Sequence, residues 1–104
     1  MYFYDDLRVG ESVRGKEKKI CRKLKRGAGM LHVHVITLNL GRDLFDIYHC
    51  AFFKQRALRK RPYCVVGIAG SHEEAVSMVM DMVQDIYKKA GNTDFKAYFS
   101  KDTV

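Results

Sequence analysis

The segment from Ser71 to Gly91 places the strongest constraint on the fold, because it carries a complete set of helix signals. Ser71 can cap the first turn, Glu74 completes a capping box, and Gly91 follows the last turn. Its apolar side chains cover an arc of roughly 200°, whereas a surface helix needs somewhat more than 100°. The pattern therefore predicts a helix over 71–90 that packs on a sheet and also touches a second surface.

A second helix is predicted over 13–26. Val13, Ile20 and Leu24 fall on one side at helical spacing, and basic residues occupy the rest of the surface. Gly27 follows directly and suits the left-handed residue that ends many helices. This helix would carry a thin apolar stripe and a strongly cationic exterior.

Strands are predicted where β-branched and aromatic residues alternate or cluster between turn signals. Added to the helices, they give the order α-β-β-β-α-β and an α+β fold class: a two-layer sandwich, with an antiparallel β-meander and both helices on one face. The length of 104 residues suits a single domain spanning 1–104. The predicted strands are 30–38, 44–54, 63–69 and 95–99, with 2–4 as an edge strand.

Composition excludes several broad classes of protein. The chain is 47% hydrophobic and 30% charged, which is typical of a globular protein rather than a disordered one. No apolar run approaches the length of a membrane span, and acidic residues stand where a signal peptide would be basic. Three widely spaced cysteines without a C-x-x-C pair argue against a disulfide framework and a structural zinc site. We expect a cytoplasmic protein that needs no metal or cofactor.

Positive charge is concentrated in two segments. Residues 14–26 carry a net charge of +7 and residues 54–61 carry +5, so the rest of the chain, whose total is +7, is acidic. Concentrated charge attracts polyanions, although a solvated face that only maintains solubility is the alternative. The predicted phosphate-contacting residues are Lys18, Lys19, Arg22, Lys23, Lys25, Arg26, Lys54, Arg56, Arg59, Lys60 and Arg61.

Three histidines raise the question of a metal site. His32, His34 and His49 could meet on one sheet face if the loop between the first two strands held an even number of residues. A three-residue loop over 39–41 would instead place His34 opposite Asp46 and turn His49 to the other face. That register predicts a His34–Asp46 pair, which serves either as a surface contact or as an oriented general base.

No complete catalytic or cofactor motif is present, so an enzyme is the less expected outcome. The favoured hypothesis is a small basic domain that contacts the phosphate backbone of nucleic acid without catalysis. The alternative is a self-associating interaction module, a homodimer formed through a sheet face or through the 71–90 helix, because both carry more apolar surface than one core needs. A small nuclease using His34 and Asp46 is a third hypothesis.

Overall fold

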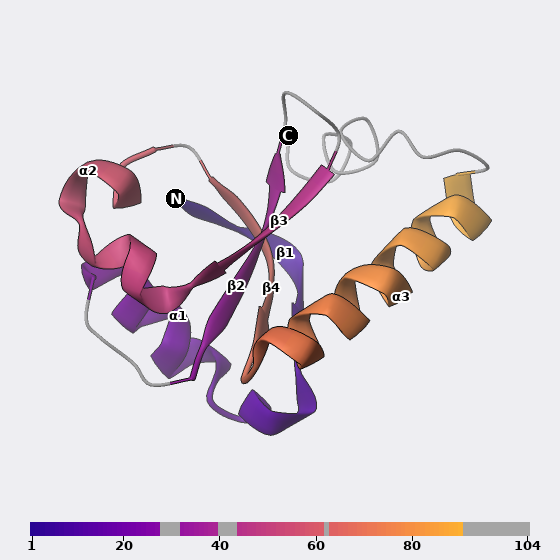
Figure 1. Ribbon diagram of the computed structural model, residues 1–104, viewed down its shortest axis with the longest axis horizontal. Coiled ribbons are helices and arrows are strands. Elements are labelled where there is room, and N and C mark those ends of the chain that lie inside the picture. The colour runs from indigo at the N-terminus through magenta and orange to yellow at the C-terminus, as the bar shows by residue number, and fades with distance from the viewer. Residues whose placement is uncertain (28–31, 40–43, 62, 91–104) are drawn as a thin grey trace.

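The computed structural model describes residues 1–27, 32–39, 44–61 and 63–90, which form a mixed sheet with helices on both sides (Figure 1). The α+β class predicted from the sequence is confirmed. The strands are β1 (Tyr2–Val9), β2 (His34–Asn39), β3 (Leu44–His49) and β4 (Cys64–Ala69). The helices are α1 (Glu17–Arg26), α2 (Arg56–Arg59) and α3 (His72–Ala90), with 3-10 turns η1 (Glu11–Val13) and η2 (Cys50–Lys54).

The strand order is β1-β4-β2-β3, which is not strictly a meander. β2 and β3 form an antiparallel hairpin, and β4 then lies on the other side of β2, also antiparallel to it. β1 is parallel to β4 at the sheet edge. Every residue of β4 is buried, and a continuous apolar run of this kind is typical of a strand covered on both faces. β4 accordingly lies between β1 and β2, with both of its faces covered.

Helices cover both faces of the sheet, whereas the sequence predicted both helices on one face. Ile36 of β2 and Val66 of β4 belong to the core beneath α3, together with Met82 of α3 itself. The neighbouring residues Val35 and Val65 face the opposite way, into the core beneath α1 and η2. Successive side chains of a strand alternate between faces, and here both sets are apolar, so each face requires its own cover.

The opening strand is longer than expected. The sequence predicted an edge strand over 2–4, and β1 continues to Val9 with an irregularity between Phe3 and Arg8. The salt bridge between Arg8 and Asp85 of α3, at 2.9 Å, ties this edge to the helix on one face.

α1 begins later than the 13–26 pattern predicted. Gly15 has a φ of 88°, which interrupts a helix, and its backbone nitrogen donates to the carboxylate of Glu17 at 2.6 Å. Val13 still packs into the core, but from η1. Gly27, with a φ of 71°, ends the helix as expected.

The helix predicted over 71–90 is confirmed as α3, and the hydroxyl of Ser71 accepts a hydrogen bond from the Glu74 nitrogen at 3.1 Å. The strand predicted over 63–69 is confirmed from Cys64 onward. The strand predicted over 95–99 lies outside the described residues. No helix in the described part of the chain is long and apolar enough to cross a membrane.

Candidate anion-binding surface

α1 presents basic side chains along two sides. It rests on the sheet through Ile20 and Leu24, which are 5% and 1% exposed. The inner flank consists of Lys16, Lys19 and Lys23, which line a pocket between α1 and the sheet. The outer flank consists of Lys18, Arg22, Lys25 and Arg26. The sequence predicted one cationic surface on this segment, and its basic residues line two different hollows.

The outer flank borders an open hollow of about 530 Å³. Cys21 also lines it, and burial raises the pKa of its thiol, so the thiol is held in its neutral form. Lys18, Arg22, Lys25 and Arg26 are exposed, which leaves their charges available to a partner. No acidic side chain lines this hollow among the described residues.

The start of β1 connects the outer flank to the second basic segment. The Lys25 ammonium lies 5.3 Å from the centre of the Phe3 ring, a cation–π contact. The Met1 nitrogen donates to the Arg61 carbonyl at 2.8 Å. Burial lowers the pKa of the Met1 amino group, and the nearby charge of Lys25 lowers it further. Lys25, near the end of α1, and Arg61 therefore both contact the first three residues of the chain.

Segment 54–61 comprises the end of η2 and the short helix α2. Figure 1 shows α1 and α2 on the same side of the sheet, opposite α3, and α1 contacts η2. The described basic side chains of the segment are exposed, and the side chain of Arg59 lies outside the described residues. The exposed basic residues are Lys54, Arg56, Lys60 and Arg61.

An aromatic cluster lies directly next to this basic segment. The rings of Tyr48 and Phe52 are stacked, with centroids 4.5 Å apart and an angle of 17° between their planes. Tyr63 meets Tyr48 edge-on at 5.7 Å, and Phe53 fills the core beneath them. Tyr48, Phe52 and Tyr63 are half-buried. Sequence reasoning missed Tyr48, because the turn that brings Phe52 back onto it was read as a continuing strand.

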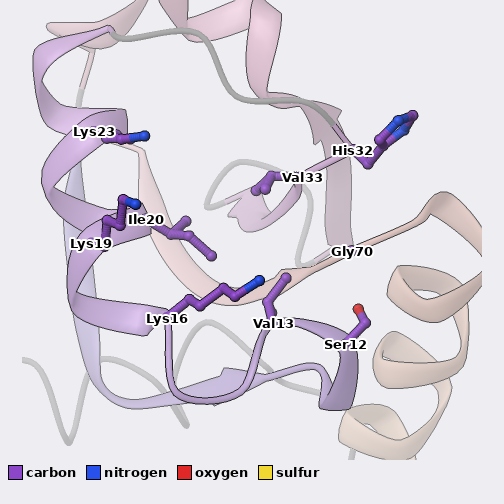
Figure 2. A pocket seen from close by; sticks show the side chains of 9 residues that line it. All are labelled: Ser12, Val13, Lys16, Lys19, Ile20, Lys23, His32, Val33 and Gly70. Atoms are coloured by element: carbon purple, nitrogen blue, oxygen red, sulfur yellow. The ribbon is translucent and has the colours of Figure 1, made fainter.

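The pocket at the inner flank has a volume of about 460 Å³ (Figure 2). Its apolar lining is Val13, Ile20 and Val33, and its remaining lining is Ser12, His32 and Gly70. Figure 2 shows Lys19 and Lys23 along the α1 side, the Lys16 side chain reaching toward Val13, and Ser12 and Gly70 at the far end, while the His32 ring points away from the lysines. The sequence assigned Lys19 and Lys23 to the nucleic-acid surface; the fold places both in this pocket.

The carboxylate of Glu74, in the first turn of α3, binds residues that precede the helix. One oxygen of Glu74 accepts from the Gly70 nitrogen and from the Ser12 hydroxyl, each at 2.7 Å, and the other accepts from the Ser12 nitrogen at 3.3 Å. These hydrogen bonds lower the pKa of the carboxyl. The donors next to the start of α3, Gly70 and Ser12, are thus bound by the protein's own side chain.

The predicted His34–Asp46 pair is wrong. The register of β2 and β3 pairs His34 with His49 and pairs Asp46 with Thr37. β2 ends at residue 39 and β3 begins at residue 44, so an even number of residues separates them. With an even number, the side chains of β3 lie on the opposite sheet faces from those predicted with a three-residue loop. Because both faces of β2 are buried, its apolar pattern carried little information about register.

The structure instead groups His34 with His49 and with His72 of α3, at ring-centroid distances of 5.1 and 5.9 Å. Burial lowers the pKa of His34, and His49 and His72 lower it further. The Nδ1 atom of His49 accepts from the Ala51 nitrogen at 3.1 Å, so its other nitrogen carries the proton and has no lone pair for a metal. Among the described residues, no group of three or more His, Cys, Asp or Glu side chains can hold a metal ion.

Among the described residues, α1 therefore borders two cationic sites of different shape: the open hollow at its outer flank and the inner pocket. Either site can attract an anion, and neither contains an arrangement of side chains that is diagnostic of a reaction. Comparison of the chain with known protein families, with curated proteins and with solved structures gave no match.

Proposed function

We propose that the protein binds nucleic acid without catalysis, through the outer flank of α1 and segment 54–61. The observation that carries the proposal is the continuity between these parts. Lys25 packs on Phe3, and the adjoining Met1 bonds to Arg61, so the two basic segments meet around the start of β1. A polyanion lying across this region would contact charges from both segments at once.

The energy of such binding would come mainly from the phosphates. Lysine and arginine side chains that neutralise phosphates release condensed counterions, which gives affinity with little sequence preference. The candidate side chains are exposed, so they can follow a flexible backbone without a large cost of desolvation. We therefore expect a steep dependence of affinity on salt concentration.

The aromatic cluster favours single strands over duplexes. Unpaired bases stack on exposed aromatic faces, and this stacking tolerates any sequence. Phe52 and Tyr63 are half-buried and adjoin segment 54–61, so a strand whose phosphates contact Arg56 and Lys60 would carry its bases past them. In a duplex, the bases are already stacked and this contribution is absent.

The test is fluorescence anisotropy with short random single- and double-stranded RNA and DNA, repeated over a range of salt concentrations. Four phosphate contacts on a single strand should give a slope of about −3 in a plot of log affinity against log salt, because each contributes about −0.7. Absence of binding to every probe at about 50 mM salt would reject the proposal.

Self-association is the second candidate, and one observation on α3 favours it. Val76, Met80 and Tyr87 are 39%, 59% and 57% exposed and fall along one line of the helix. Both sheet faces are covered by helices, which leaves α3 as the described surface for this alternative. Sedimentation analysis of wild type and Met80→Glu tests it: a dimer that the substitution dissociates supports it, and a wild-type monomer rejects it.

A further inference from the structure

We propose that the pocket between α1 and the sheet is a second, separate site that binds a small organic phosphate of mononucleotide size. The inference does not depend on the proposed nucleic-acid function, because the two sites use opposite flanks of α1. The pocket volume of about 460 Å³ falls within the range of roughly 300–1,000 Å³ that is usual for small-molecule sites.

The anion specificity comes from Lys16, Lys19 and Lys23. They occur at spacings of three and four residues, which places neighbouring ammonium groups on the same side of a helix, where they repel one another. No carboxylate lines the pocket among the described residues, so this repulsion is not relieved locally. A phosphate placed among the three would relieve it and form charge-assisted hydrogen bonds.

The apolar lining indicates that the ligand is more than inorganic phosphate. Val13, Ile20 and Val33 form the apolar wall of the pocket and are each about 5–6% exposed. An ion surrounded by its own hydration shell gains nothing from such a wall, whereas a base or another flat apolar group gains by covering it. In Figure 2, Ile20 lies beside Lys19, and Val13 lies beside the end of the Lys16 side chain.

The far end of the pocket supplies an acceptor. Both donors of Ser12, its nitrogen and its hydroxyl, are already directed to Glu74. The Ser12 hydroxyl oxygen can therefore only accept a hydrogen bond from a ligand. This end of the pocket favours a donor group and disfavours a second phosphate. A ligand with phosphate at one end and a hydroxyl or amino donor at the other, as in a mononucleotide, matches this polarity.

The backbone at the pocket rim is strained. His32 has a φ of 61°, the left-handed conformation that residues with a Cβ rarely adopt. Strain of this kind occurs preferentially at ligand sites, where a fixed backbone shape is useful. Here it positions the turn that leads into Val33, one wall of the pocket.

Calorimetric titration and thermal-shift measurements with AMP, adenosine and inorganic phosphate test the proposal. AMP should bind and raise the melting temperature, adenosine should not, and phosphate should bind more weakly than AMP. The double variant Lys19→Gln/Lys23→Gln should lose about tenfold or more in AMP affinity, because it removes two charge-assisted hydrogen bonds. Its melting temperature without ligand should be unchanged or higher, since it also removes a repulsion.

The matched control is Lys18→Gln/Lys25→Gln, which removes two charges from the outer flank of the same helix and should keep wild-type AMP affinity. AMP should also leave the binding of an oligonucleotide with unphosphorylated ends unchanged. Equal losses of AMP affinity in the two double variants, displacement of AMP by that oligonucleotide, or phosphate binding as tight as AMP binding would each overturn the assignment. AMP binding without any oligonucleotide binding would support the pocket and reject the proposed function alone.

Discussion

The hydroxyl of Ser12 donates a hydrogen bond of 2.7 Å to the carboxylate of Glu74, and this bond joins the turn after β1 to the first turn of α3. The same carboxylate also holds the Gly70 nitrogen, so one side chain fixes the junction of β1, β4 and α3. Gly10 and Gly70 both lie so close to this junction that a Cβ atom at either would collide with Glu74 or Ser12. The position of Ser12 in the inner pocket depends on this junction.

Replacing Glu74 should therefore destabilise the fold. We expect Glu74→Ala to lower the free energy of unfolding by about 1–2 kcal/mol, because it removes charged hydrogen bonds that water partly screens. Chemical denaturation measures this decrease. Glu73→Gln, at the exposed neighbouring position, should change stability by less than about 0.5 kcal/mol. Similar decreases in the two variants would show that the hydrogen bonds of Glu74 do not stabilise the junction.

His34 should make stability depend on pH in the mildly acidic range. Its pKa in the folded protein lies below its ordinary value of 6.5, so the unfolded chain binds the proton more tightly. The contribution of His34 to the free energy of unfolding is therefore fully present above about pH 6.5, and it decreases as the pH drops from there toward the lowered pKa. In His34→Gln, the melting temperature should change less with pH over this range. An unchanged pH profile in that variant would contradict the role of His34.

Glu74 should make stability depend on pH in a second, more acidic range. Its pKa is lowered from an ordinary value of 4.5, so its contribution to stability is present above that pH and is lost as the pH falls toward the folded value. In Glu74→Gln, the fall of melting temperature below about pH 4.5 should be shallower than in wild type. The His34 window near pH 6.5 should remain in this variant, which separates the two groups.

Neutralising Lys60 and Arg61 should weaken nucleic-acid binding and its salt dependence together. For each phosphate that Lys60→Gln/Arg61→Gln no longer neutralises, the salt slope on single strands should fall in magnitude by about 0.7. Lys88→Gln/Lys89→Gln removes the same charge from exposed positions on α3, across the sheet, and is the control. If both variants weaken binding equally, net charge rather than the proposed surface governs the affinity.

Removing the Phe52 ring should affect single strands selectively. Stacking of a base on an aromatic side chain contributes about 1–3 kcal/mol, and Phe52 is half-buried, so we expect Phe52→Leu to cost about 1 kcal/mol in single-strand affinity. Duplex affinity should stay the same. Phe53→Leu, in the buried core, should lower the melting temperature instead. Equal weakening of single-strand and duplex binding by Phe52→Leu would argue against stacking.

Local signals in the sequence were sufficient for several elements. Ser71, Glu74 and the acidic first turn marked the start of α3, and the apolar run ending at Ala69 marked β4, because caps and hydrophobic runs act over a few residues. The two concentrations of positive charge are likewise a property of the sequence. What a local signal cannot specify is which face of the sheet each helix covers.

The tertiary structure decided the register and the grouping of the charges. His34 lies beside His49 rather than Asp46. The sequence could not predict this register, because β2 packs between β3 and β4 with both faces covered, and its alternating apolar pattern fits either register. The basic residues of α1 separate into two sites because Ile20 and Leu24 anchor the helix along its middle. Contacts between residues far apart in the chain set these outcomes, whereas the sequence by itself determined α3, β4 and the distribution of positive charge along the chain.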